Sequence, residues 1–121
     1  MNNFETVPLC EVVVTAPDPD WLLEFSKELV EERLAASVHH FTPVQSVYRW
    51  NGLLHVRSEG RASLHTRSAH VSEIVRRAKE RHPYQVPSIS ARPIVDGSSD
   101  YLNWIKSETE LAGASDRSRQ P

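Results

Sequence analysis

The stretch His82-Pro83-Tyr84-Gln85-Val86-Pro87 separates a helical pattern from a strand pattern and fixes the turn between them. A proline restricts the residue before it to extended conformations, because its ring clashes with the preceding backbone. Pro83 therefore moves His82 out of the helical region, and Pro87 does the same to Val86. The stiff turn holds its histidine, tyrosine and glutamine in a nearly fixed geometry. That geometry suits a ligand site, although prolines past a helix end are also common as plain stops.

Before this turn, strand and helix patterns alternate. Residues 9–15 are β-branched and almost continuously apolar, which is typical of a central strand buried on both faces, with Cys10 as a small core residue. Residues 19–36 follow helical spacing, and Asp18 provides an N-cap. A second helix is predicted over 68–81, with Ser68 as its cap. Its apolar stripe consists of Val71, Ile74, Val75 and Ala78.

Between the two helices lies a pair of long strands, 37–50 and 53–66, around Asn51-Gly52. Asn-Gly is the strongest short hairpin signal, because both central residues of a type I′ turn need positive φ. Pairing about that turn places Tyr48 opposite His55 and Ser46 opposite Arg57.

Pro43 interrupts the first strand of this hairpin. Because proline cannot donate to a ladder, we expect a bulge or bend there. Each strand has about 14 residues, well beyond the ordinary length of ~5–6. A small domain cannot cover the far end of such a hairpin, so the sequence indicates an oligomer.

After the turn, residues 88–95 form a strand pattern that Pro93 marks as an edge or bulge. Ser98 or Ser99 then caps a short helix that buries Tyr101, Leu102 and Ile105. Residues 112–121 contain no large apolar residue and are predicted to be a disordered tail, which leaves 1–111 as a single domain.

The predicted order is therefore β-α-β-β-α-β followed by a helix, an α+β fold of the ferredoxin-like, split βαβ type. Four antiparallel strands would carry two helices on one face. The other face lacks cover within the chain, which is a second indication of an oligomer.

Composition excludes several function classes. The chain has 121 residues and a formal charge of -2, with both signs interspersed, which argues against charge-driven binding to nucleic acid or membranes. No apolar run approaches the ~18 residues of a membrane span. The N-terminus lacks the features of a signal peptide, and the single Cys10 cannot form an internal disulfide, so a cytoplasmic location is expected.

No local motif indicates catalysis: the sequence has no G-x-S-x-G, no P-loop and no dinucleotide fingerprint. His39 and His40 are neighbours on a strand, so their rings point to opposite faces and cannot chelate one ion without a bulge. The remaining histidines show no metal-ligand spacing. These are His55, His65 and His70.

Five blocks, in order and with matching spacing over residues 9–107, resemble the signature blocks of the CutA divalent-cation-tolerance family. They are 13–18 (VVTAPD), 29–36 (LVEERLAA), 46–52 (SVYRWNG), 82–87 (HPYQVP) and 100–105 (DYLNWI). The resemblance implies a tight ferredoxin-like homotrimer whose long hairpins extend into neighbouring subunits, an architecture similar to the PII signalling proteins. It implies a role in tolerance of copper and other divalent ions, and no accepted enzymatic activity.

Some members of that family are described as binding copper through a strand cysteine and two consecutive histidines. Here Val14 stands at the cysteine position and Arg81 at the first histidine, so only His82 matches. Loss of a thiolate and an imidazole removes most of the affinity for copper, and a guanidinium opposes a cation. No cofactor is therefore certain, and Cu²⁺ binding at His82 is expected to be weak. The resemblance places Trp50, Glu59, His65 and Tyr84 in the cleft between subunits.

The leading hypothesis is thus a homotrimer of cation tolerance that acts by binding rather than catalysis. The alternative is a PII-like signalling module with a small organic ligand or an anion in the intersubunit cleft. An anion would be favoured by Arg57, Arg61, His65 and Arg81. An enzyme using the same cleft is a third possibility, which no motif supports.

Overall fold

The computed structural model describes residues 8–111. Its elements are β1 (Leu9–Ala16), α1 (Pro19–Glu31), β2 (Ser37–Trp50), β3 (Leu53–Arg67), the 3₁₀ turn η2 (Ser68–His70), α2 (Val71–Arg81), β4 (Ser88–Pro93) and α3 (Ser99–Glu108). This order confirms the predicted succession of strands and helices, a mixed α+β fold. The tail predicted to be disordered, 112–121, lies outside the described residues. No helix within residues 8–111 has the length and apolar character needed to span a bilayer.

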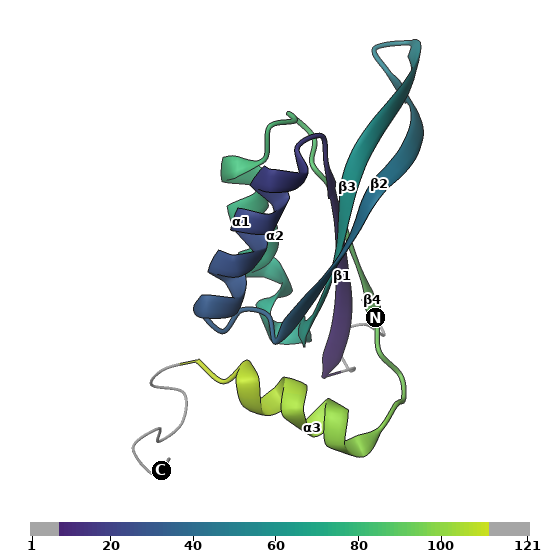
Figure 1. Ribbon diagram of the computed structural model, residues 1–121. Coiled ribbons are helices and arrows are strands. Elements are labelled where there is room, and N and C mark those ends of the chain that lie inside the picture. The colour runs from purple at the N-terminus through teal and green to yellow at the C-terminus, as the bar shows by residue number, and fades with distance from the viewer. Residues whose placement is uncertain (1–7, 112–121) are drawn as a thin grey trace.

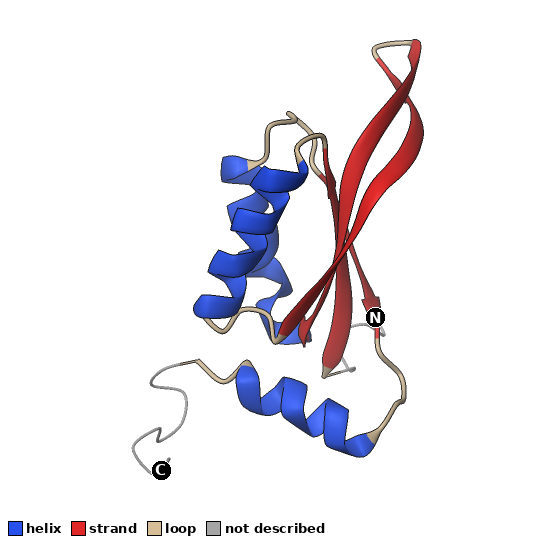
Figure 2. Ribbon diagram, viewed as in Figure 1, coloured by secondary structure: helices blue, strands red, loops and turns tan. Residues whose placement is uncertain are grey.

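The four strands form one antiparallel sheet in the order β2-β3-β1-β4. The continuously apolar strand β1 is central, as predicted: it pairs with Gly60–Arg67 on one side and with Ser88–Pro93 on the other. Helices α1 and α2 cover one face of the sheet, and α3 lies at the end opposite the hairpin tip (Figures 1 and 2).

The core lies between this sheet and the two helices. Alternate residues of β1 face the helices and are almost fully buried, because successive strand side chains point to opposite faces. Those residues are Cys10, Val12, Val14 and Ala16. Leu22, Phe25 and Leu29 of α1 and Ile74 and Ala78 of α2 close the cluster from the other side. Burying each such large aliphatic side chain contributes roughly 1.5–3 kcal/mol.

The hairpin of β2 and β3 has the predicted turn and register. Asn51 and Gly52 have φ of 52° and 77°, and the pairs Tyr48–His55 and Ser46–Arg57 are both present. The register shifts between Phe41 and Val44, around Pro43, which confirms the predicted bulge.

Beyond residue 60 towards its tip, the hairpin has no support from the rest of the sheet. β1 pairs with β3 only as far as Gly60, so residues 53–59 pair with β2 alone, and the hairpin projects past the helices (Figure 1). Its apolar side chains are strongly exposed, and they include Val47, Leu53, Leu54 and Val56.

Three predicted boundaries were wrong. Helix α1 ends at Glu31 rather than at residue 36, because Arg33 adopts a left-handed conformation with φ 63°. The amide of Arg33 then bonds the carbonyl of Val30, and the amide of Leu34 bonds that of Leu29, which is a Schellman stop. Glycine usually occupies the left-handed position, so an arginine there hid the helix end.

The other two wrong boundaries are the start of α2 and the end of β4. Helix α2 begins at Val71, and Ser68 opens the 3₁₀ turn instead of capping the helix. Strand β4 ends at Pro93, which has no N–H of its own to donate to the ladder, instead of continuing to residue 95. The amide of the next residue, Ile94, still bonds the carbonyl of Leu9 in β1.

Candidate ligand-binding site

His82 ties the turn after α2 to the end of β1. Its backbone is extended, with φ -67° and ψ 140°, as the following Pro83 requires. Its Nε2 donates to the carbonyl of Thr15 at 2.7 Å, and its Nδ1 accepts the amide of Tyr84 at 3.0 Å. These partners define the neutral tautomer with the proton on Nε2. The ring is buried against Trp21, so both nitrogens are engaged within the protein.

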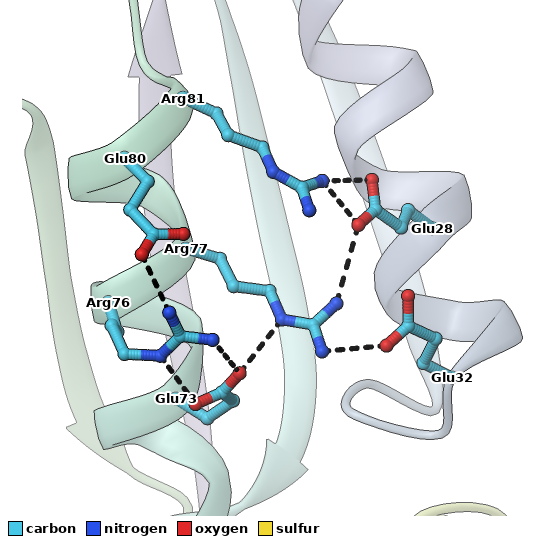
Figure 3. A network of polar contacts seen from close by, with 7 residues as sticks. All are labelled: Glu28, Glu32, Glu73, Arg76, Arg77, Glu80 and Arg81. Atoms are coloured by element: carbon cyan, nitrogen blue, oxygen red, sulfur yellow. Dashed lines mark hydrogen bonds and ion pairs between the residues drawn. The ribbon is translucent and has the colours of Figure 1, made fainter.

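The residues around His82 do not form a ready copper site. Val14 is buried in the core, and the Arg81 side chain points away to Glu28 on α1 (Figure 3). The thiol of Cys10 is buried in that core as well, and burial raises its pKa to about 11, which disfavours the thiolate that a metal needs. Within residues 8–111 no three His, Cys, Asp or Glu side chains are grouped so that they could hold a metal. Weak Cu²⁺ binding at His82 therefore stays a prediction.

A network of ion pairs links α1 and α2 just before the turn (Figure 3). Arg77 reaches Glu32 at 2.7 Å, Glu73 at 2.9 Å and Glu28 at 3.3 Å. The hydrogen bonds to Glu32 and then to Glu73 raise the pKa of Arg77. In return, hydrogen bonds from Arg76 and then Arg77 lower the pKa of Glu73 to about 2. The network fixes the last turns of α2 against α1, and with them the start of the stretch 82–87.

Beside this turn lies a cavity of about 660 Å³. The hairpin contributes Ser46, Tyr48, Trp50 and Glu59, and the turn contributes Tyr84 and Gln85. The volume is that of pockets for small organic molecules, and most such pockets are apolar with a few polar groups. Three of the four residues predicted for the cleft therefore line one cavity within a single chain: Trp50, Glu59 and Tyr84.

The hydroxyl of Tyr84 connects the polar groups at this cavity. It donates to Glu59 Oε2 at 2.7 Å and accepts from Arg57 Nη1 at 3.0 Å. Burial and the hydrogen bond to Glu59 raise the pKa of Tyr84 to about 12, so the phenol is neutral at ordinary pH. Glu59 is only 4% exposed, and no salt bridge to it occurs among the described residues.

The fourth predicted cleft residue, His65, lies elsewhere. Its Nδ1 is 2.5 Å from the hydroxyl of Tyr101 on α3, and its Nε2 is 3.8 Å from Glu11 of β1. Burial lowers its pKa, while Glu11 acts in the opposite direction. The structure thus places His65 on the sheet face near α3, away from the cavity beside Tyr84.

The basic side chains expected to favour an anion do not line the cavity either. Arg57 bonds Tyr84, Arg81 bonds Glu28, and Arg61 lies over the ring of Phe41 at 5.8 Å. The residue that sequence reasoning missed is Arg57 as a partner of Tyr84. The hairpin register placed Arg57 opposite Ser46, but no local pattern showed that the distant turn would reach it.

Comparison with known proteins adds a family. The family model described as "CutA1 divalent ion tolerance protein" matches residues 10–108. The divalent-cation tolerance protein CutA of Thermus thermophilus is 37% identical over 98 residues, which are 81% of this chain and 95% of that protein. The protein of the same name from Pectobacterium atrosepticum is 36% identical over 101 residues, or 81% and 92% of the two chains. Of the chloroplastic CutA protein of Arabidopsis thaliana, the chain spans 59%, at 34% identity.

Solved structures give the same result. The periplasmic divalent cation tolerance protein CutA from Archaeoglobus fulgidus superimposes with a TM-score of 0.81 at 32% identity, over 84% of this chain and 99% of that one. The Thermus thermophilus protein gives a TM-score of 0.80 at 36% identity, over 84% and 98%.

Proposed function

The chain belongs to the CutA1 divalent ion tolerance family, and from this premise we propose that it serves tolerance of divalent metal ions, copper among them, by binding rather than by catalysis. The match over residues 10–108 carries the proposal, because it covers the strands and helices of the described structure except for Leu9, the first residue of β1. Binding is favoured over catalysis because the cavity combines aromatic walls with a few fixed polar groups, an arrangement that orients a ligand. We place the protein in the cytoplasm, where its one buried thiol would stay reduced.

The physiological test is growth of the source organism, with and without this chain, over graded concentrations of CuSO₄. We expect the strain that lacks this protein to stop growing at a lower CuSO₄ concentration than the strain that has it. Expression of the protein from a plasmid should restore growth. If the strains with and without the chain grew identically at every concentration of copper and of other divalent ions, the tolerance role would be overturned.

We further propose that the working form is a homotrimer of ferredoxin-like subunits. The support is the projecting hairpin, whose tip is unsupported and carries exposed Val47, Leu53, Leu54 and Val56. Contiguous exposed apolar side chains of this kind mark interaction sites. Light scattering coupled to size exclusion, at micromolar concentration, should give three times the chain mass of 13.7 kDa. A mass of one chain would contradict the assembly.

Direct Cu²⁺ binding is proposed to be weak and to depend on His82. A metal on either nitrogen of this ring would replace a hydrogen bond to Thr15 or Tyr84, and no soft thiolate lies at Val14. Calorimetric titration of Cu²⁺ into the tag-free protein should show a weak signal that His82→Ala lowers. Arg81→His should raise it by supplying a second imidazole.

Tight native binding that survives His82→Ala would contradict this placement of the site. It would direct attention to the remaining histidines, which are His39, His40, His55, His65 and His70. Ile89→Val serves as a matched control, because it changes an apolar side chain of β4 without touching an imidazole.

The cavity beside Tyr84 favours a second candidate function, a PII-like signalling role in which a small organic ligand binds in the cleft. Its volume of about 660 Å³ and its aromatic lining are the specific observations. Thermal-shift assays with a metal panel and a panel of small organic molecules separate the two candidates, because a ligand of the native state stabilises it by RT ln(1+[L]/Kd).

A further inference from the structure

Glu59 is a nearly buried carboxylate whose side chain, within residues 8–111, makes a single hydrogen bond, the one to Tyr84. Its exposed fraction is 4%, its Oε2 accepts from the Tyr84 hydroxyl at 2.7 Å, and it takes part in none of the ion pairs of residues 8–111. Removing a carboxylate from water without a cationic partner is costly. One neutral hydroxyl offsets only part of that cost. A cation bound beside Glu59 would therefore stabilise the carboxylate.

Among the described residues of this chain, Glu59 is the one charged side chain that lines the cavity. The other lining groups are apolar, hydroxyl, amide or phenol, and the phenol of Tyr84 is neutral at ordinary pH. Arg57 donates to the same Tyr84 hydroxyl, makes no ion pair with Glu59, and does not line the cavity. The charge that this chain presents to a bound molecule is therefore negative.

Aromatic rings supply the second half of the site. Tyr48 and Trp50 from β2 and Tyr84 from the turn line the same cavity as Glu59. One face of Tyr48 is stacked on His55 at 5.3 Å, which holds the ring in place. Aromatic faces attract cations through their quadrupole, and cages of such rings are a recurrent way to bind organic ammonium ions.

We propose that the cavity beside Tyr84 binds a small organic ammonium ion, with Glu59 as its counterion and Tyr48, Trp50 and Tyr84 as its aromatic walls. The proposal rests on the second candidate function, a small-ligand role for this cavity, and it names the chemical class of that ligand. It reverses the expectation of an anion, because the arginines that favoured one have other partners and do not line the cavity.

The test uses three probes that share one ring and differ in charge: benzylammonium, benzyl alcohol and benzoate. Each is titrated calorimetrically into the full native chain, after size exclusion has confirmed its oligomeric state. We expect benzylammonium to bind at least about tenfold more tightly than benzyl alcohol, and benzoate to bind weakest. Glu59→Gln keeps an acceptor for Tyr84 and removes only the charge, so it should reduce the preference for benzylammonium to within about threefold.

Two more variants make the result specific. Trp50→Leu removes one aromatic wall and should also weaken benzylammonium more than benzyl alcohol. Glu24→Gln, on the exposed face of α1, is the matched control and should leave all three affinities unchanged. The ratio of affinities within each variant does not depend on how much of the sample is folded, so a partly destabilised variant remains informative.

Equal binding of the three probes would contradict the proposal of an organic ammonium ligand, but it would still support a small-ligand role for the cavity. Tighter binding of benzoate would do the same in favour of an anion. No binding of any probe at millimolar concentration would overturn both the class and the cavity, whereas the metal-tolerance proposal is judged by growth on CuSO₄ alone.

Discussion

At the residue scale, single backbone conformations decide where elements begin and end. Asn51 and Gly52 have positive φ, as their dipeptide predicted, and the hairpin register follows from them. Arg33 has positive φ as well, but an arginine side chain does not favour that conformation, so the sequence did not predict it. Local sequence rules thus predict a conformation where the residue type favours it, and they fail where packing imposes it, here by burying Leu34 and Ala35 after the helix.

Gly52→Ala should lower the free energy of unfolding by about 1–2 kcal/mol, because φ is +77° and an L residue is strained there. A Cβ at this position meets nothing within 4 Å, so the loss measures backbone conformation alone. Urea denaturation at a fixed chain concentration gives the value. Gly97→Ala is the control and should have a smaller effect, since its Cβ would make ordinary contact with Leu102. Equal losses for the two variants would contradict this account.

Cys10 should resist modification in the folded protein. Its side chain has no exposed surface, and burial raises its thiol pKa to about 11, so little thiolate is present at pH 8. Reaction with Ellman's reagent should be at least a hundredfold slower in buffer than in denaturant. Fast labelling in buffer would show that the strand containing Cys10 opens readily.

At the element scale, α1 and α2 are joined by packing and by the ion pairs around Arg77 (Figure 3). Periodicity alone was enough to predict both helices, because each buries one stripe against the sheet. The ion pairs between the helices were not predictable in the same way. They depend on the relative position of two elements about 45 residues apart in the chain, which only the folded structure defines.

Stability should fall in acid because of these pairs. Hydrogen bonds from Arg76 and Arg77 lower the folded-state pKa of Glu73 to about 2 from an ordinary value of 4.5. Its contribution is therefore complete above about pH 4.5 and is lost as pH falls towards 2. Melting temperatures measured from pH 7 to pH 2 should decline over that window, and less steeply in Glu73→Gln. The control Glu24→Gln should follow the unmodified chain; equal slopes for all three would exclude this cause.

At the scale of the whole molecule, the cleft predicted from the family blocks divides into two places. Trp50, Glu59 and Tyr84 meet at one cavity because the turn 82–87 lies beside the projecting part of the hairpin. His65 is on the same strand as Glu59 but lies six residues further along it. At that position its side chain contacts Tyr101 of α3. Whether the predicted residues form a ligand site stays a prediction; the places of Glu59 and His65 along β3 decide which of the two lines the cavity.

Val56→Asp should dissociate the proposed trimer. Val56 is 64% exposed in the single chain and lies on the unsupported part of the hairpin, so a subunit contact there would bury the new charge at a large cost. Size exclusion with light scattering should show single chains at concentrations where the unmodified protein is trimeric. Leu23→Asp on α1, at 42% exposure, is the matched control and should remain trimeric. A trimer that survives Val56→Asp would remove this part of the hairpin from the interface, and dissociation of both variants would show that the effect is not specific to the hairpin.

The central position of β1 also has a consequence during protein synthesis. Leu9–Ala16 leaves the ribosome first, yet its partners are Gly60–Arg67 and Ser88–Pro93. At typical translation rates, the second partner is made roughly 4–15 seconds after β1. Until Gly60–Arg67 has been made, the most apolar segment of the sheet has neither neighbour, and until Ser88–Pro93 has been made it has only one. The nascent chain thus exposes a β-branched segment that is prone to aggregation, and chaperones that hold such segments would determine how much of the protein reaches its native state.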